Sequence, residues 1–408
     1  MKISQIRINN IGGIKQAEIN FKSGMNVVCG YNGVGKTTIL NCIAHSFAYS
    51  VGSDVLSRNA NSENGNVSAH LYEDDVNGYF ARDKRTNFNV KHFNPDESEH
   101  LSPGNESDIS LNIINLGVDR FLKYTKVKSI PSDSVYSRYT VDNNIINGST
   151  TTDFKSWFLN RFLYSKHEGS LEDFQIKNMQ FAIDCFSILD KDFSFSRVMA
   201  SSNEVMINTP SGEIFFEYLS SGFKSCLSIL FSIIKEVEFC SKDKRKVASD
   251  FDGVILIDEP EIHLHPSWQY KIKSILTTAF PKAQFICASH SPYVVQSCSS
   301  GEVITLVNKK GVVTVCDQLS DSTYGFQGWT IEEVLDDVMG MPDARTKLYK
   351  SKVDDFYNSI SKNEKKVARE IFNDLDSMLH PNSIDRKIFK LDLAMLTGGE
   401  RDQAVKGD

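Results

Sequence analysis

The stretch best suited to chemistry in this 408-residue chain lies near the N-terminus and reads Gly30-Tyr31-Asn32-Gly33-Val34-Gly35-Lys36-Thr37-Thr38. It fits G-x-x-x-x-G-K-[ST], the pattern of a phosphate-binding loop between a strand and a helix. Glycines let the backbone approach a phosphate closely, Lys36 supplies a point charge, and the Thr37 hydroxyl can bind Mg²⁺. We therefore expect this loop to bind ATP with Mg²⁺. The expected contacts are Gly30, Asn32, Gly33, Val34, Gly35, Lys36, Thr37 and Thr38.

A second group of reactive side chains follows two apolar runs that are typical of strands buried on both faces. Asp258 and Glu259 follow the run 253–257, and His290 follows the run 284–288. A carboxylate at the end of such a strand can hold Mg²⁺, and a second carboxylate can activate water, so we assign Asp258 to magnesium and Glu259 to the catalytic base. His290 is placed to hydrogen-bond a γ-phosphate or the attacking water.

Residues 219–222, Leu-Ser-Ser-Gly, precede a helical pattern and form a third candidate site. A hydroxyl, a glycine and a helix N-terminus can together bind an anion, so Ser220 and Gly222 are predicted nucleotide contacts. The alternative is an ordinary helix cap, which is the commoner meaning of Ser-Gly before an apolar run. The position of this sequence between the phosphate loop and Asp258 favours the nucleotide interpretation.

The elements that must position these residues follow an α/β pattern. Strand patterns occur within 1–30 and at 67–72, 78–82, 110–116, 253–257, 284–288 and 302–307, with a hairpin turn between the second and third of these. Helical spacing occurs at 37–49, 154–164, 171–189, 223–239 and 265–278. We predict a doubly wound α/β head of the P-loop NTPase type, with a mixed, mostly parallel sheet and an antiparallel β portion.

We divide the chain into four segments. Residues 1–90 and 196–320 form the two halves of the head, and residues 91–195 form a helical and loop insertion between them. Residues 321–408 are predicted to be a helical region that binds a partner. Its end, 391–408, lacks a core pattern, and we expect a partner to order it.

Composition excludes several classes of protein. The net charge of −7 argues against a protein that is basic overall and binds nucleic acid, although basic residues cluster locally at Lys123, Lys126, Lys128 and Arg138 and again in 242–246. Eight scattered cysteines without a C-x-x-C pair indicate free thiols in a reducing compartment. We find no signal peptide and no apolar run that could span a bilayer, so we expect a cytoplasmic protein without a membrane partner.

The order and spacing of these motifs resemble the ABC-type ATPases of the RecF/SMC/OLD group over residues 1–50 and 215–310. The resemblance implies an ABC-type ATPase head that forms a homodimer, in which two protomers enclose two ATP molecules. Ser220 and Gly222 would then touch the γ-phosphate bound by the partner. No long heptad arm is present, which excludes a true SMC protein.

A closer resemblance is to the PtuA-type ATPases of Septu systems and of some retrons. It rests on GYNGVGKTT, DEPEIHLHPSWQ, SHSPYVV and the later segment 329–335 with Met339-Gly340. The resemblance implies an ATPase subunit of an antiphage defence system that binds and regulates a separate HNH nuclease of the PtuB type. DNA or retron nucleic acid and assemblies larger than a dimer remain open as partners.

Two other functions compete with this one. A RecF-like repair ATPase would bind DNA directly and load other proteins, and it would need a basic stripe. An OLD-type enzyme would carry its own nuclease site. Glu332, Glu333, Asp336 and Asp337 instead have the i,i+4 spacing of a solvated helix face, so we expect no nuclease site in this chain.

Overall fold

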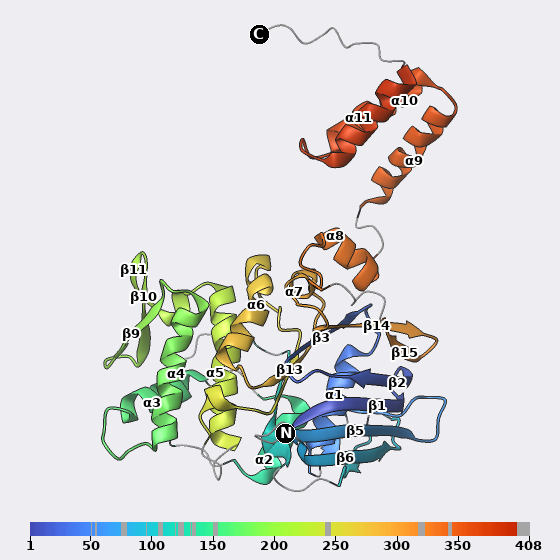
Figure 1. Cartoon of the computed structure of the whole chain (residues 1–408). Helices are drawn as coiled ribbons and strands as arrows, with labels where there is room; N and C mark the ends of the chain where they lie inside the picture. Colours follow the sequence, from blue (N-terminus) through green and yellow to red (C-terminus); the bar gives the residue numbers. More distant parts are fainter. Residues whose placement is uncertain are drawn as a thin grey trace. The chain divides into compact units, whose positions relative to one another are not determined.

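The computed structural model (Figure 1) consists of two compact units, the head (Met1–Met341) and the C-terminal unit (Pro342–Asp408), and each is described by itself. The structure describes residues 1–49, 51–53, 55–74, 80–94, 96–104, 109–118, 120, 126–130, 132, 136–149, 154–240, 246–316, 323–341 and 345–397.

The described part of the head is built around a 10-stranded sheet in the order β6-β5-β1-β2-β15-β14-β3-β13-β12-β8. Its strands are β1 (Lys2–Ile11), β2 (Ile14–Asn20), β3 (Met25–Gly30), β5 (Gly65–Asp74), β6 (Phe80–Val90), β8 (Ile113–Leu116), β12 (Val254–Asp258), β13 (Gln284–Ala288), β14 (Val303–Lys309) and β15 (Val312–Val315). Strands β14, β3, β13, β12 and β8 are parallel, so their carboxyl ends lie at one edge. This edge carries the candidate site.

Two hydrophobic cores cover the two faces of the parallel strands. Along β12, Ile255 and Ile257 belong to one core, and Val254 and Leu256 belong to the other, as the alternation of side chains in a strand requires. Helix α1 (Lys36–Phe47) packs into the core on the Val254 side. Helices α4 (Asp173–Leu189), α5 (Ser221–Cys240) and α6 (Pro266–Ala279) contribute to the other core, and α4 packs beside α5 (Figure 1).

The antiparallel portion consists of β6, β5, β1 and β2 and joins the parallel strands through the β14–β15 hairpin. Strand β15, which the sequence analysis did not anticipate, runs parallel to β2 and closes the gap between the two portions. The predicted hairpin is confirmed as β5 paired with β6, although both strands are longer than predicted and its turn, 75–79, lies outside the described residues. The predicted mixed α/β fold class is confirmed.

Further elements surround the sheet. They are β4 (Val51–Ser53), β7 (Glu99–Leu101), α2 (Arg138–Asn147), α3 (Phe154–Tyr164), β9 (Ser194–Met199), β10 (Glu204–Thr209), β11 (Gly212–Phe215), α7 (Pro292–Gln296), α8 (Ile331–Glu333) and a π-helical turn at Val334–Val338. The segment 91–195, which we predicted to be an insertion, differs from that prediction because it supplies β8, a strand of the main sheet beside β12.

The chain divides later than the predicted boundary at 321. Phe326, Val334 and Val338 are buried in the core of the head, so residues 323–341 belong to the head. Within the described residues, no helix combines the length and the apolar character that crossing a membrane requires.

The C-terminal unit contains α9 (Lys347–Ser361), α10 (Lys365–Met378) and α11 (Ile384–Thr397) around a small core of its own. The expectation that 391–408 needs a partner for order is corrected for its first part. Helix α11 reaches Thr397, and Phe389 and Leu393 are buried against Phe356 and Leu375. Residues 398–408 lie outside the described residues.

Candidate functional site

The phosphate loop follows β3, a strand buried along its whole length, and leads directly into α1. Gly30, Gly33 and Gly35 have φ values of 137°, 76° and 104°, in the region that favours glycine. A Cβ on Gly30 would lie 2.4 Å from the Leu306 carbonyl oxygen. A Cβ on Gly33 would meet no atom within 4 Å, so the loop faces open space there. The strand, loop and helix order required of the motif is therefore present.

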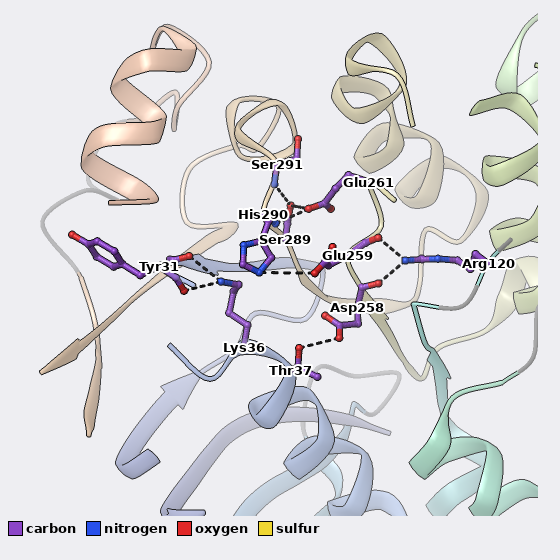
Figure 2. A network of polar contacts seen from close by, with 11 residues as sticks. Tyr31, Lys36, Thr37, Arg120, Asp258, Glu259, Glu261, Ser289, His290 and Ser291 are labelled. Atoms are coloured by element: carbon purple, nitrogen blue, oxygen red, sulfur yellow. Dashed lines mark hydrogen bonds and ion pairs between the residues drawn. The ribbon is translucent and has the colours of Figure 1, made fainter. Parts of the chain in front are cut away.

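Lys36 spans this loop (Figure 2). Its Nζ donates hydrogen bonds to the carbonyl oxygens of Gly30 and Tyr31, at 2.9 and 3.0 Å. Burial lowers the pKa of the Lys36 ammonium below its ordinary value, and the neighbouring carboxylates oppose this effect. The two hydrogen bonds thus hold the Lys36 ammonium over the loop, where it would meet a phosphate.

Thr37 and Asp258 meet across the two elements that carry them. The Thr37 hydroxyl donates a hydrogen bond of 3.0 Å to Asp258 Oδ2. Burial raises the pKa of the Asp258 carboxyl, while the hydrogen bond from Thr37 acts in the opposite direction. A hydroxyl and a carboxylate side by side are the oxygen donors that Mg²⁺ prefers beside a phosphate. These two residues therefore fit the predicted magnesium position.

Glu259 has an unusual backbone conformation that aims its side chain. Its φ of 49° lies in the left-handed region, which costs an L-residue about 1–2 kcal/mol. Its N–H donates to the Ala288 carbonyl oxygen at 2.8 Å, and its Oε1 lies 4.0 Å from His290 Nε2. Burial, and then the charge of Lys36, lower the pKa of His290, so its imidazole is neutral at pH 7. A carboxylate and a neutral imidazole thus lie together beside the loop.

Arg120 is a site residue that sequence reasoning missed. It follows β8, is 2% exposed, and donates from Nη2 to the main-chain carbonyl oxygens of both Asp258 and Glu259 (Figure 2). A single arginine in a loop carries no motif. The sequence did offer one signal for Arg120, which is its position shortly after the predicted strand 110–116. The ends of parallel strands meet at one edge of a sheet, so a residue there can lie near Asp258.

Glu261 is a second missed residue, although it lies in the DEPEIHLHP motif. Its Oε1 accepts hydrogen bonds from the Ser289 hydroxyl at 3.0 Å and from the His290 N–H at 2.5 Å. Burial raises the pKa of the Glu261 carboxyl above its ordinary value. Glu261 therefore ties the turn after β12 to the loop that carries His290.

The residues of the Leu-Ser-Ser-Gly sequence have roles within their own chain. The Ser220 hydroxyl accepts a hydrogen bond of 3.3 Å from the Phe223 N–H at the start of α5. A Cβ on Gly222 would lie 2.9 Å from Trp268 Cδ1, so the indole packs directly on this glycine. In the described part of the chain, no hydrogen bond joins Ser220 or Gly222 to the phosphate loop.

The structure thus brings most of the predicted site residues together at one edge of the sheet. Lys36, Thr37, Asp258, Glu259 and His290 form one cluster, drawn in Figure 2. The remaining predicted loop contacts differ in exposure: Asn32 is exposed, Val34 is buried and Thr38 is half-buried. Their contacts with a nucleotide stay a prediction.

Comparison with known proteins finds relatives that match most of this chain. Residues 25–296 match the model of the family described as "AAA domain, putative AbiEii toxin, Type IV TA system". The chain is 37% identical to the Septu protein PtuA of Bacillus thuringiensis over 395 residues, which cover 96% of this chain and 98% of that protein.

Two further similarities are more limited. The chain is 34% identical over 97 residues to the Retron Vc95 probable ATPase of Vibrio cholerae serotype O1 biovar El Tor, covering 24% of this chain and 18% of that protein. Among solved structures, the SmcHead bound to the C-winged helix domain of ScpA aligns with 78% of this chain and 97% of its own, at 16% identity and a TM-score of 0.46. The family resemblance seen in the motifs is confirmed by the matches over most of the chain: the protein belongs to the AAA-domain family and to the Septu PtuA family.

Proposed function

We propose that this chain is the ATPase subunit of an antiphage defence system, and that it hydrolyses ATP and binds and regulates a separate HNH nuclease of the PtuB type. The observation that carries the hydrolytic part is the cluster at the carboxyl ends of β12 and β13, where Thr37 meets Asp258 and Glu259 lies beside His290. The family membership and the names of the Septu and retron relatives support the defence role.

Each residue of the cluster has one task in this proposal. Lys36 and the N–H groups of the loop bind the phosphates, at the positive end of α1. Thr37 and Asp258 hold Mg²⁺, which supplies positive charge beside the phosphates. Glu259 orients the attacking water and takes its proton, and the neutral imidazole of His290 hydrogen-bonds the water or the γ-phosphate.

The proposal includes an ATP-dependent homodimer. Ser220 and Gly222 lie at the N-terminus of α5, and no hydrogen bond between described residues joins them to their own phosphate loop. A helix N-terminus with a hydroxyl that can donate its hydrogen to a phosphate oxygen can bind the γ-phosphate of a second protomer. ATP occupancy is then the switch, and hydrolysis resets it.

The C-terminal unit is the proposed nuclease-binding region. Its core is small, and Leu348, Ile384, Leu391 and Met395 expose much of their apolar surface. Ile384, Leu391 and Met395 recur at i, i+7 and i+11 and so share one face of a helix, and an exposed apolar face favours a protein partner. Ile384, Leu391 and Met395 all belong to α11, which makes this helix the first place to test.

Direct DNA binding gains no support from the described basic residues. Arg138 pairs with Asp142 at 3.1 Å, and Lys246 pairs with Asp252 at 2.6 Å. Lys126 and Lys128 are exposed, but two lysines do not make the basic stripe that direct DNA binding needs. The other basic residues in question, Lys123, Lys242, Lys244 and Arg245, lie outside the described residues. We therefore do not advance the RecF-like function as a second candidate.

The test is a pull-down of the tagged chain expressed from its native operon, with mass determination in the presence and absence of ATP. We expect an HNH protein to co-purify in a fixed ratio and the mass of the complex to depend on ATP. A chain that purifies alone, dimerises on ATP and retards DNA in a gel would overturn the nuclease-regulator proposal in favour of the RecF-like one.

A further inference from the structure

Arg120 makes its contacts with the catalytic turn through one nitrogen. The guanidinium is buried, and its Nη2 carries two hydrogens, one for the Asp258 carbonyl oxygen and one for the Glu259 carbonyl oxygen (Figure 2). Both acceptors belong to the main chain, so these contacts leave the two carboxylates free for other partners. Arg120 thus holds the backbone of the turn.

These hydrogen bonds complete a clamp around Glu259. The peptide between Asp258 and Glu259 is held on both sides, because its carbonyl accepts from Arg120 and its N–H donates to the Ala288 carbonyl at 2.8 Å. The next peptide joins Glu259 to Pro260, and it has no N–H because proline lacks one. This peptide can therefore be held only through the Glu259 carbonyl oxygen, which accepts from Arg120. Fixing the peptides before and after Glu259 fixes its φ and ψ.

The clamp matters because the backbone of Glu259 is strained. At a φ of 49°, an L-residue relaxes toward negative φ unless its surroundings prevent it. Such a relaxation would rotate the Cα–Cβ bond and carry the carboxylate away from its position 4.0 Å from His290 Nε2. The direction of the Glu259 side chain therefore depends on contacts made by its backbone.

Stability alone is a poor explanation for a charge buried in this way. In the described part of the chain, Arg120 Nε and Nη1 are buried and have no hydrogen-bond partner. Unpaired buried N–H groups destabilise a fold. Arg161, another buried arginine of the head, instead forms an ion pair with Glu238 and a hydrogen bond with Asn160.

We propose that Arg120 is a positioning residue for catalysis, which aims Glu259 by holding the main chain of the turn after β12. This inference rests on the proposed role of Glu259 as the catalytic base. Arg120 itself touches no reacting atom, and the phosphate loop is built without it. Its loss is therefore expected to lower kcat and to leave the KM for ATP unchanged.

The test compares Arg120→Met with Arg161→Met in the full-length chain. Misplacing a catalytic group by about 1 Å costs on the order of 100-fold in rate, so we expect Arg120→Met to lower kcat about 100-fold. Arg120→Lys retains a donor and should recover part of this loss. Arg161→Met removes a buried arginine away from the site, and it should lower thermal stability with kcat unchanged.

A double-mutant cycle with Glu259→Gln separates positioning from a general structural effect. Once the carboxylate is absent, Arg120→Met should cause no further loss of the residual turnover. The inference is overturned by an Arg120→Met chain with wild-type kcat, or by an equal fold-loss in both backgrounds. If Arg120→Met does not fold, Arg120→Lys decides in the same way. A wild-type chain that does not hydrolyse ATP would instead refute the proposed function.

Discussion

Gly340 and Tyr31 form a contact between distant parts of the sequence, and replacing the glycine should disturb the phosphate loop. A Cβ on Gly340 would lie 1.7 Å from Tyr31 Cε1, far inside any possible contact distance. Tyr31 belongs to the loop, and its carbonyl oxygen accepts a hydrogen bond from Lys36. We predict that Gly340→Ala displaces the Tyr31 ring, weakens ATP binding and destabilises the head.

Two effects contribute to the destabilisation by Gly340→Ala. The φ of Gly340 is 65°, a conformation that costs an alanine about 1–2 kcal/mol. Tyr31 is 49% exposed, so its ring can turn toward solvent, and displacing it adds up to about 1 kcal/mol, less than overpacking costs in a closed core. Replacing Tyr31 with alanine removes the clash and leaves the backbone strain, so Gly340→Ala should cost only about 1–2 kcal/mol in a Tyr31→Ala background.

The assay is thermal unfolding, together with titration of a fluorescent ATP analogue, on the four proteins of this double-mutant cycle. Gly328→Ala in the same segment is the matched control, because its Cβ would meet no atom within 4 Å. We expect Gly328→Ala to leave ATP affinity unchanged, and Tyr31→Ala to restore the affinity that Gly340→Ala loses. Equal effects of Gly340→Ala with and without the Tyr31 ring would show that contact with the ring is not the cause.

Two further predictions concern acid stability and the partner-binding unit. Burial lowers the pKa of His45 from 6.5 to about 4 in the folded chain. As the pH falls, the imidazole is therefore protonated first in the unfolded chain. About 3 kcal/mol of folding stability is present above pH 6.5 and is lost as the pH falls toward 4. The check is to measure the free energy of unfolding of wild type and of His45→Gln across this pH range. Wild type should lose this stability and His45→Gln should not, so parallel pH profiles would contradict the prediction. In α11, Leu391→Ser should weaken co-purification of the nuclease without changing thermal unfolding, because Leu391 is exposed. As a contrast, Leu393→Ala removes a buried side chain and should lower the stability of the unit by about 2–5 kcal/mol. A Leu391→Ser chain that keeps its nuclease would argue against α11 as the docking helix.

Local patterns predicted much of the parallel core and its motifs. Runs such as 254–257 and 284–288 are apolar on both faces, and the rule that parallel strand ends meet at one edge places Asp258 and His290 near each other. The same logic explains why the phosphate loop and its helix were found with nearly correct bounds.

What could not be predicted depends on which strands and segments are neighbours. Arg120 reaches the catalytic turn because β8 pairs with β12, a contact between segments far apart in the sequence. The packing of Gly340 on Tyr31 has the same origin. Helix α11 was missed in part because its buried positions, Phe389 and Leu393, are sparse among polar residues, so the pattern of its final turns was weak.

The most direct test of the central claim is ATP turnover by Glu259→Gln, measured with ATP affinity and with particle mass by light scattering. Glu332→Gln, an exposed glutamate on α8, is the matched control. We expect Glu259→Gln to bind ATP as the wild type does, to lose turnover and to accumulate as an ATP-bound dimer, and we expect Glu332→Gln to behave as wild type. Unchanged turnover and equal dimerisation of wild type and Glu259→Gln with ATP would contradict it.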